Sequence, residues 1–144
     1  MHILVSIMKR IRTAIIFLGL LVLGCSSPAD STRIRGEWKA VEMGENLKEL
    51  SPQLIQSTRE IVLSSTYTFK ENNVVLHSSL YYEQGTMGTW RLDEEAQKIY
   101  LEFKDVEGYD KTEYIIVSFS GSEMTWINEV QELGHISIRL ERQS

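Results

Sequence analysis

The side chains of this sequence that could carry chemistry are few and far apart. Beyond residue 24 there are one cysteine, Cys25, and two histidines, His77 and His135. The sequence contains no Gly-x-Ser-x-Gly, the pattern that marks the nucleophilic serine of many hydrolases. Nothing in the spacing brings the two histidines together, so we expect each to lie at the surface or at a strand edge. We therefore predict no catalytic residues and no enzymatic activity.

Three acidic side chains gather in one predicted turn, where Asp105, Glu107 and Asp110 surround Gly108. Carboxylates can ligate calcium, but this spacing does not match the calcium loop of helix–loop–helix proteins. We interpret the group as a solvated hairpin turn. The sequence accordingly predicts neither a metal site nor a cofactor.

Cys25 stands where the polarity of the chain changes abruptly. Basic side chains in residues 9–12 precede the apolar run 14–23, which is about half of the ~20 residues that a transmembrane helix needs. A basic stretch, a short apolar stretch and then a small residue, here Gly24, are typical of a secretory signal. We expect residues 1–24 to be removed and the small polar residues of 25–33 to form a flexible tether. With no second cysteine, Cys25 has no partner for an internal disulfide.

The sequence Leu21-Val22-Leu23-Gly24-Cys25 resembles the lipobox of bacterial lipoproteins, in which a small residue precedes the modified cysteine. It departs at Val22, where leucine is usual. The resemblance implies a diacylglycerol on the sulfur of Cys25 and an acyl group on the new amino terminus. More than one chain is what stable anchoring requires. Because Ser26 rather than aspartate follows Cys25, analogy with the enterobacterial sorting rule predicts the outer membrane of the cell envelope.

Composition excludes several classes of partner. Residues 1–24 hold three of the 15 basic residues and none of the 20 acidic ones, so their removal leaves a net charge of −8. Such a chain lacks the basic face that nucleic-acid binding needs. It is also not attracted electrostatically to anionic lipid. The length of 25–144 suits one domain, and we place that domain at residues 34–144.

Most of this domain alternates between apolar and polar residues with the period of two that is typical of strands. In 61–70, for example, Ile61, Leu63, Tyr67 and Phe69 share one face. Short polar or glycine-containing turns separate such segments, so successive strands should pair antiparallel. The pattern predicts eight strands, at 35–43, 61–70, 74–82, 87–93, 98–104, 112–119, 123–129 and 135–142.

The one long connection, 44–60, predicts a short helix between the first two strands. Leucines recur in it at helical spacing, and Ser51-Pro52 is a favourable helix start, so we place the helix at 51–59. Eight meandering strands must hide two sheet edges, and closure into a barrel removes both. We therefore predict an all-β, eight-stranded antiparallel up-and-down barrel, with an open or flattened barrel as the second choice.

Three motifs in this order resemble the lipocalin-like domains of bacterial lipoproteins. They are Gly36-Glu37-Trp38 at the start of the first strand, Tyr67-Thr68-Phe69-Lys70, and Gly88-Thr89-Trp90. The resemblance implies a lipocalin-like barrel that opens on Gly36 and is closed at its floor by Trp38. It also implies that a basic residue of the last strand, Arg139 or Arg142, packs over the indole, an arrangement that cation–π attraction favours.

Two functions of different classes follow from such a barrel. In the first, the interior holds a small apolar ligand, contacted by Leu54 of the helix and by Tyr67, Phe69, Trp90 and Trp126, with Ser65, Ser78 and Ser118 as inward polar groups. In this view the helix is a lid, and Leu54 or Ile55 faces Tyr67, Trp90 or Trp126. In the second, the interior is solid, and the barrel is a structural module or an interaction module for another envelope protein.

Overall fold

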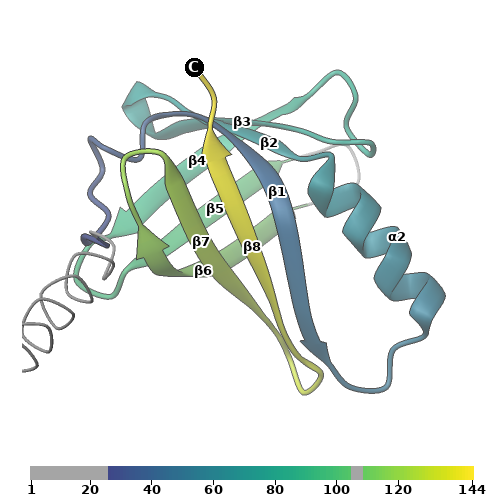
Figure 1. Cartoon of the computed structure of the whole chain (residues 1–144). Helices are drawn as coiled ribbons and strands as arrows, with labels where there is room; N and C mark the ends of the chain where they lie inside the picture. The colour runs from purple at the N-terminus through teal and green to yellow at the C-terminus, as the bar shows by residue number, and fades with distance from the viewer. Residues whose placement is uncertain (1–25, 105–108) are drawn as a thin grey trace, which may run out of the picture.

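A computed structural model describes residues 26–104 and 109–144 as a closed barrel of eight antiparallel strands (Figure 1). This confirms the predicted fold class, including the helix between the first two strands. The elements are β1 (Gly36–Leu47), α2 (Pro52–Leu63), β2 (Thr66–Phe69), η1 (Glu71–Asn73), β3 (Val74–Ser78), β4 (Thr86–Asp93), β5 (Lys98–Lys104), β6 (Tyr109–Phe119), β7 (Glu123–Val130) and β8 (Gly134–Arg142).

Closure depends on the length of β1. Its first residues, from Gly36 to Lys39, pair with β2, and the stretch from Trp38 to Leu47 pairs with β8. One strand therefore joins both edges of an otherwise open meander, and Figure 1 shows β1 and β8 side by side. The register shifts between Ala40 and Glu42, and such a bulge increases the bend that closure requires.

The helix is longer than predicted, and β2 is shorter. Ser51 caps α2 by accepting a hydrogen bond from the backbone N–H of Leu54, and the helix continues to Leu63. The prediction of a strand at 61–65 was wrong. A nucleated helix gains one hydrogen bond for each residue added, and its last turn packs Val62 against the barrel core. Alternation of apolar residues over 61–63 fitted either structure.

The two ends of the barrel differ, and we name them by what covers them. The strap end is where β1 begins and β8 ends, and residues 26–35, here called the strap, cross it. The helix end carries α2, the loop 79–85 and the turn 131–133. In Figure 1 the strap lies at the left of the barrel, and α2 runs beside β1 at the right.

Trp38 closes the strap end as the resemblance implied. Its ring is fully buried, and its Nε1 donates a hydrogen bond of 2.8 Å to the carbonyl of Ile34. The guanidinium of Arg142 lies 4.3 Å from the ring centroid. Gly36 has a φ of +122°, and a Cβ there would collide with the same guanidinium. Glycine is thus required at this position both for its backbone conformation and for space.

Arg139, named with Arg142 as a possible partner of Trp38, was the wrong choice for that role. Ile138 and Leu140 point into the core, so Arg139 lies on the outer face of β8 while Arg142 shares the inner side. On the outside, Arg139 forms ion pairs with Glu42, Glu123 and Glu141 at 2.8–3.1 Å.

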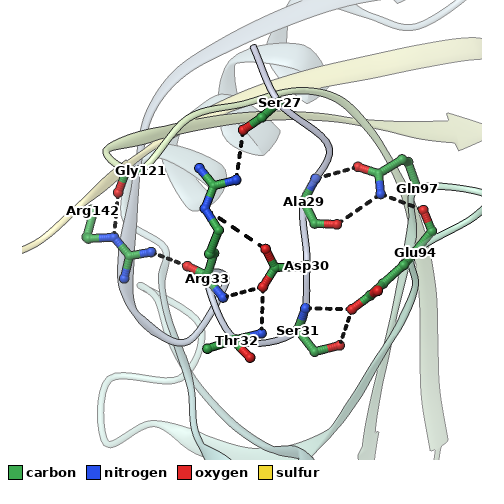
Figure 2. A network of polar contacts seen from close by, with 10 residues as sticks. All are labelled: Ser27, Ala29, Asp30, Ser31, Thr32, Arg33, Glu94, Gln97, Gly121 and Arg142. Carbon is green, nitrogen blue, oxygen red and sulfur yellow. Dashed lines mark hydrogen bonds and ion pairs between the residues drawn. The ribbon is translucent and has the colours of Figure 1, made fainter. Parts of the chain in front are cut away.

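The strap is part of the folded domain, which corrects the expectation that residues before 34 form a flexible tether. Ala29 and Ile34 are 1% and 0% exposed. The side chain of Gln97 holds the backbone of Ala29 by two hydrogen bonds. The Gln97 Oε1 accepts from the Ala29 N–H at 2.8 Å, and the Gln97 Nε2 donates to the Ala29 carbonyl at 3.0 Å. The Glu94 carboxylate accepts from the N–H and hydroxyl of Ser31. Figure 2 shows these contacts together with those of Arg142.

Within the strap, Asp30 forms a local turn. Its carboxylate accepts from the backbone N–H groups of Thr32 and Arg33 at 3.0 and 2.9 Å, and its carbonyl accepts from Ile34. The Arg33 guanidinium donates to the hydroxyl of Ser27, whose N–H in turn donates to the carbonyl of Phe119 on β6. The strap is therefore anchored to the barrel from Ser27 onward.

The described residues include no helix with both the length and the apolar character needed to span a bilayer.

Replacing Trp38 with alanine should lower the free energy of unfolding by about 3–5 kcal/mol, because the change removes buried apolar surface and leaves a cavity at the floor. Urea denaturation of the protein that begins at residue 25 measures this. Tyr81→Ala is the control, since Tyr81 is 75% exposed and its loss should cost no more than about 0.5 kcal/mol. Equal midpoints for the two variants would contradict the role of Trp38 as a buried plug.

Candidate functional site

Polar side chains enter the barrel interior at the helix end. β2 supplies Tyr67, β3 supplies His77 and β6 supplies Tyr114, while Ser65 precedes β2 directly after the last turn of α2. We call these four residues, with Trp126 of β7, the polar cluster. The register places Tyr67 opposite His77 on neighbouring strands, so these two rings face each other by virtue of strand pairing alone.

His77 lies inside the barrel, which corrects its prediction as a surface or edge histidine. Its ring stacks on that of Tyr67, with centroids 4.5 Å apart and planes 3° from parallel. Its Nε2 lies 3.3 Å from the hydroxyl oxygen of Ser65. The rings of Phe103 and Tyr82 pack at 5.6 and 6.0 Å from it. Because β3 is apolar at positions 74–76 on both faces, its alternation did not indicate which face points inward.

Trp126 connects the two tyrosines at the centre of the cluster. Its ring stacks on that of Tyr114 with centroids 4.4 Å apart, and it meets the ring of Tyr67 edge-on at 5.2 Å. The hydroxyl groups of Tyr67 and Tyr114 are close enough that each affects the pKa of the other. The indole N–H of Trp126 is buried and has no hydrogen-bond partner among the described residues. By contrast, the indole of Trp90 donates to the carbonyl of Lys70.

Burial keeps every titratable group of the cluster neutral near pH 7. Desolvation lowers the pKa of His77 from 6.5 to about 4, although the carboxylate of Asp110 opposes the shift. Desolvation also raises the pKa of Tyr67 above its ordinary value and that of Tyr114 well above it. The cluster therefore presents neutral hydrogen-bonding groups in an apolar surrounding.

With the fold and this cluster described, comparison with known protein families becomes informative. The model of the lipocalin-like domain family matches residues 34–126. The chain belongs to this family. No curated protein and no solved structure matches the chain significantly. The match begins at the residue that bonds the Trp38 indole and extends through the polar cluster to Trp126.

Ser65 and His77 lie close together in this lipocalin-like barrel, but their contacts differ from those of a nucleophile and its base. The hydroxyl of Ser65 is buried and donates to the carbonyl of Ile61, so it is not held as a nucleophile toward His77. A histidine with a pKa near 4 is also a weak general base at neutral pH. Lipocalin-like domains are generally non-catalytic.

The structure brings together four of the five residues predicted to contact a ligand. Tyr67, Phe69, Trp90 and Trp126 are 0–6% exposed, and their rings pack on one another at 5.2–6.4 Å. Leu54 does not join them. It lies near the start of α2 and is 50% exposed, so the predicted contact of Leu54 with these rings was wrong. Val62, at the other end of the helix, packs against the core instead.

Of the three serines predicted to point inward, only Ser65 does so. Ser65 lies inside and is 3% exposed. Ser78 shares the outer face of β3 with Leu76, and Ser118 is exposed beside a register shift in β6. The predicted acidic turn lies partly outside the described residues, because Asp105 and Glu107 fall in the gap. Within the described ranges, no group of three or more histidine, cysteine or acidic side chains is arranged to hold a metal.

The outer surface of the barrel carries a groove near the helix end. A hollow of about 630 Å³ lies over β6, β7 and the turn into β8. Apolar side chains on its floor include Ile115 and Ile127, which are register partners on neighbouring strands, and Leu133. Lys48, Glu129 and His135 line its rim.

Protonation of His77 should destabilise the fold. Its folded pKa of about 4 lies below its ordinary value of 6.5, so the unfolded chain binds a proton that the folded chain does not. Stability should therefore fall as pH decreases from about 6.5 to about 4, and His77→Gln should remove this part of the decrease. Urea unfolding at several pH values measures it.

His135→Gln is the matched control, because it removes a histidine of β8 that lies outside the polar cluster. This variant should keep the full pH dependence of the parent protein. If His77→Gln also kept it, then burial of His77 would not set its pKa.

Proposed function

We propose that this protein is a lipid-anchored lipoprotein of the bacterial outer membrane whose lipocalin-like barrel binds one small, mostly apolar ligand at its helix end. The observation that carries the binding proposal is the buried indole N–H of Trp126, for which the described residues offer no acceptor. A buried donor without an acceptor costs about 1–3 kcal/mol, so a ligand that supplies an acceptor recovers that free energy on binding. The anchoring proposal rests on the signal sequence and on Cys25.

The surroundings of Trp126 support this class of ligand. Small-molecule sites are mostly apolar and contain a few precisely placed polar groups. Here the rings of Phe69 and Phe103 supply the apolar lining, and Tyr67, His77 and Tyr114 supply neutral polar groups. No group of this cluster is charged near pH 7, so the cluster offers no partner to a charged ligand. The ligand therefore needs a hydrogen-bond acceptor rather than a permanent charge.

Side-chain packing limits the size of the ligand. Trp90, Phe69 and Trp126 fill the barrel from its middle toward the floor, where Trp38 and Phe119 pack at 5.9 Å. A ligand can therefore approach only above these rings, where His77 and Tyr114 are partly exposed. The indole N–H is buried, so a neighbouring side chain must shift before an acceptor can approach it. A flat molecule of one or two rings fits this requirement better than a long acyl chain.

The packed interior also favours a second function. If the aromatic rings do not move apart to admit a ligand, the barrel is a solid module that contacts another envelope protein. Its surface offers the groove over Ile115, Ile127 and Leu133 for that purpose. The ring faces of Tyr67 and Phe69, which meet Trp126 nearly perpendicularly, would then serve as weak acceptors for its N–H.

Titration with 2-acetylnaphthalene, a small, flat and uncharged ketone, separates the two functions. We expect micromolar binding that changes tryptophan emission. Trp126→Phe removes the N–H but keeps a ring, and it should weaken binding about fivefold, since one hydrogen bond is worth about 1 kcal/mol. Trp90→Phe is the control, because the Trp90 N–H already bonds Lys70. No binding of 2-acetylnaphthalene at micromolar concentration, together with no small molecule retained in native mass spectrometry of protein from its own envelope, would favour the solid module.

Anchoring is tested separately. Cys25→Ser should abolish labelling by radioactive fatty acid and should release the protein from the membrane fraction, because the sulfur that would carry the diacylglycerol is gone. Ser26→Ala is the control and should leave both unchanged. A Cys25→Ser protein that is still labelled and membrane-bound would disprove the lipid anchor at this residue.

A further inference from the structure

The strap leaves very little free chain between the proposed anchor and the barrel. Its first backbone hydrogen bond to the barrel joins the N–H of Ser27 to the carbonyl of Phe119 at 3.0 Å. Ser27 also receives a hydrogen bond of 2.8 Å from Arg33. Cys25 lies two residues earlier, and two extended residues span only about 7 Å. A lipid on Cys25 therefore cannot let the barrel move far from the bilayer.

We propose that the docked strap holds the barrel directly on the bilayer, with one defined corner facing the lipid. This corner, here called the anchor corner, consists of residues 26–28 of the strap and residues 116–119 of β6. The helix end, with its polar cluster, then points away from the membrane. The inference rests on the proposed lipidation of Cys25 and goes beyond it by assigning the orientation of the domain.

The composition of the anchor corner fits a bilayer surface. A hollow of about 270 Å³ there is lined by eight residues that carry no charge: Ser26, Ser27, Pro28, Gln97, Ile116, Val117, Ser118 and Phe119. The rest of the chain beyond residue 24 has a net charge of −8, so most of its surface would be repelled by anionic headgroups. An uncharged corner next to the anchor avoids this repulsion.

Val117 supplies the apolar contact. It lies where the β6–β7 register shifts between Ile116 and Ser118, and it is 52% exposed. A shift of this kind redirects a side chain from the regular strand pattern. Ile115 and Ile127, which are register partners on the same outer side, extend the apolar surface from Val117 toward the helix end. An isolated exposed valine needs no explanation, but this one adjoins the residues that follow the anchor.

Quenching by membrane-bound nitroxide tests this orientation. Val117→Cys and Met87→Cys are made in the full-length gene, and each purified lipoprotein is labelled with a thiol-reactive bimane. Met87 is the matched control, because it is also apolar and exposed, at 65%, but lies at the helix-end start of β4. Lipidated Cys25 has no free thiol, so only the introduced cysteine reacts.

The labelled proteins are reconstituted in vesicles of phosphatidylethanolamine and phosphatidylglycerol that contain a headgroup-nitroxide lipid. We expect the label at position 117 to be quenched at least threefold more strongly than the label at position 87. A ten-residue Gly-Ser insertion between Ser26 and Ser27 keeps the strap contacts but lengthens the reach, and it should abolish the difference.

The outcomes distinguish this proposal from the anchoring proposal. If mass spectrometry shows no lipid on Cys25, the anchor itself is disproved, and the orientation with it. If Cys25 is lipidated but the two labels are quenched equally, or position 87 more strongly, the anchor stands and the orientation is wrong. Quenching at position 117 that survives the insertion would also overturn the role of the short strap.

Discussion

The barrel is closed at one end by a single arginine of β8 that contacts three other segments. The Arg142 guanidinium lies over the ring of Trp38 and donates hydrogen bonds to the carbonyls of Arg33, Arg35 and Gly121. These contacts join β8, β1, the strap and the β6–β7 turn. Burial lowers the pKa of this arginine from its ordinary value, but the group remains fully protonated in any physiological range. Gly36 leaves the space that the guanidinium occupies.

Closing the barrel in this way makes its two ends unlike. From the floor to the middle, the interior is filled with large apolar side chains, so the fold is stabilised there by packing. At the helix end the interior turns polar, with His77, Tyr67 and Tyr114 around an indole N–H that lacks a partner in the described residues. The neutral polar side chains of the interior are thus concentrated away from the floor.

The sequence predicts the barrel well because alternation and short turns are local signals. The strap could not be predicted in the same way, since residues 26–33 have the small, polar composition of a linker. Their backbone is held by Gln97, which lies 68 residues beyond Ala29 in the sequence. The choice of Arg142 over Arg139 was available from the alternation of β8, which puts position 142 on the same side as Ile138 and Leu140. The inward direction of His77 depended on the register of β3 with β2.

The central claim of this account is that the strap belongs to the folded barrel. Amide hydrogen exchange of the protein that begins at residue 25 tests it most directly. The N–H groups of Ala29, Ser31 and Ile34 donate to Gln97, Glu94 and Asp30, respectively. We predict that these three amides exchange as slowly as those of β1 and β8. Exchange at the rate of an unstructured peptide, while β1 and β8 stay protected, would contradict the account and restore a flexible tether.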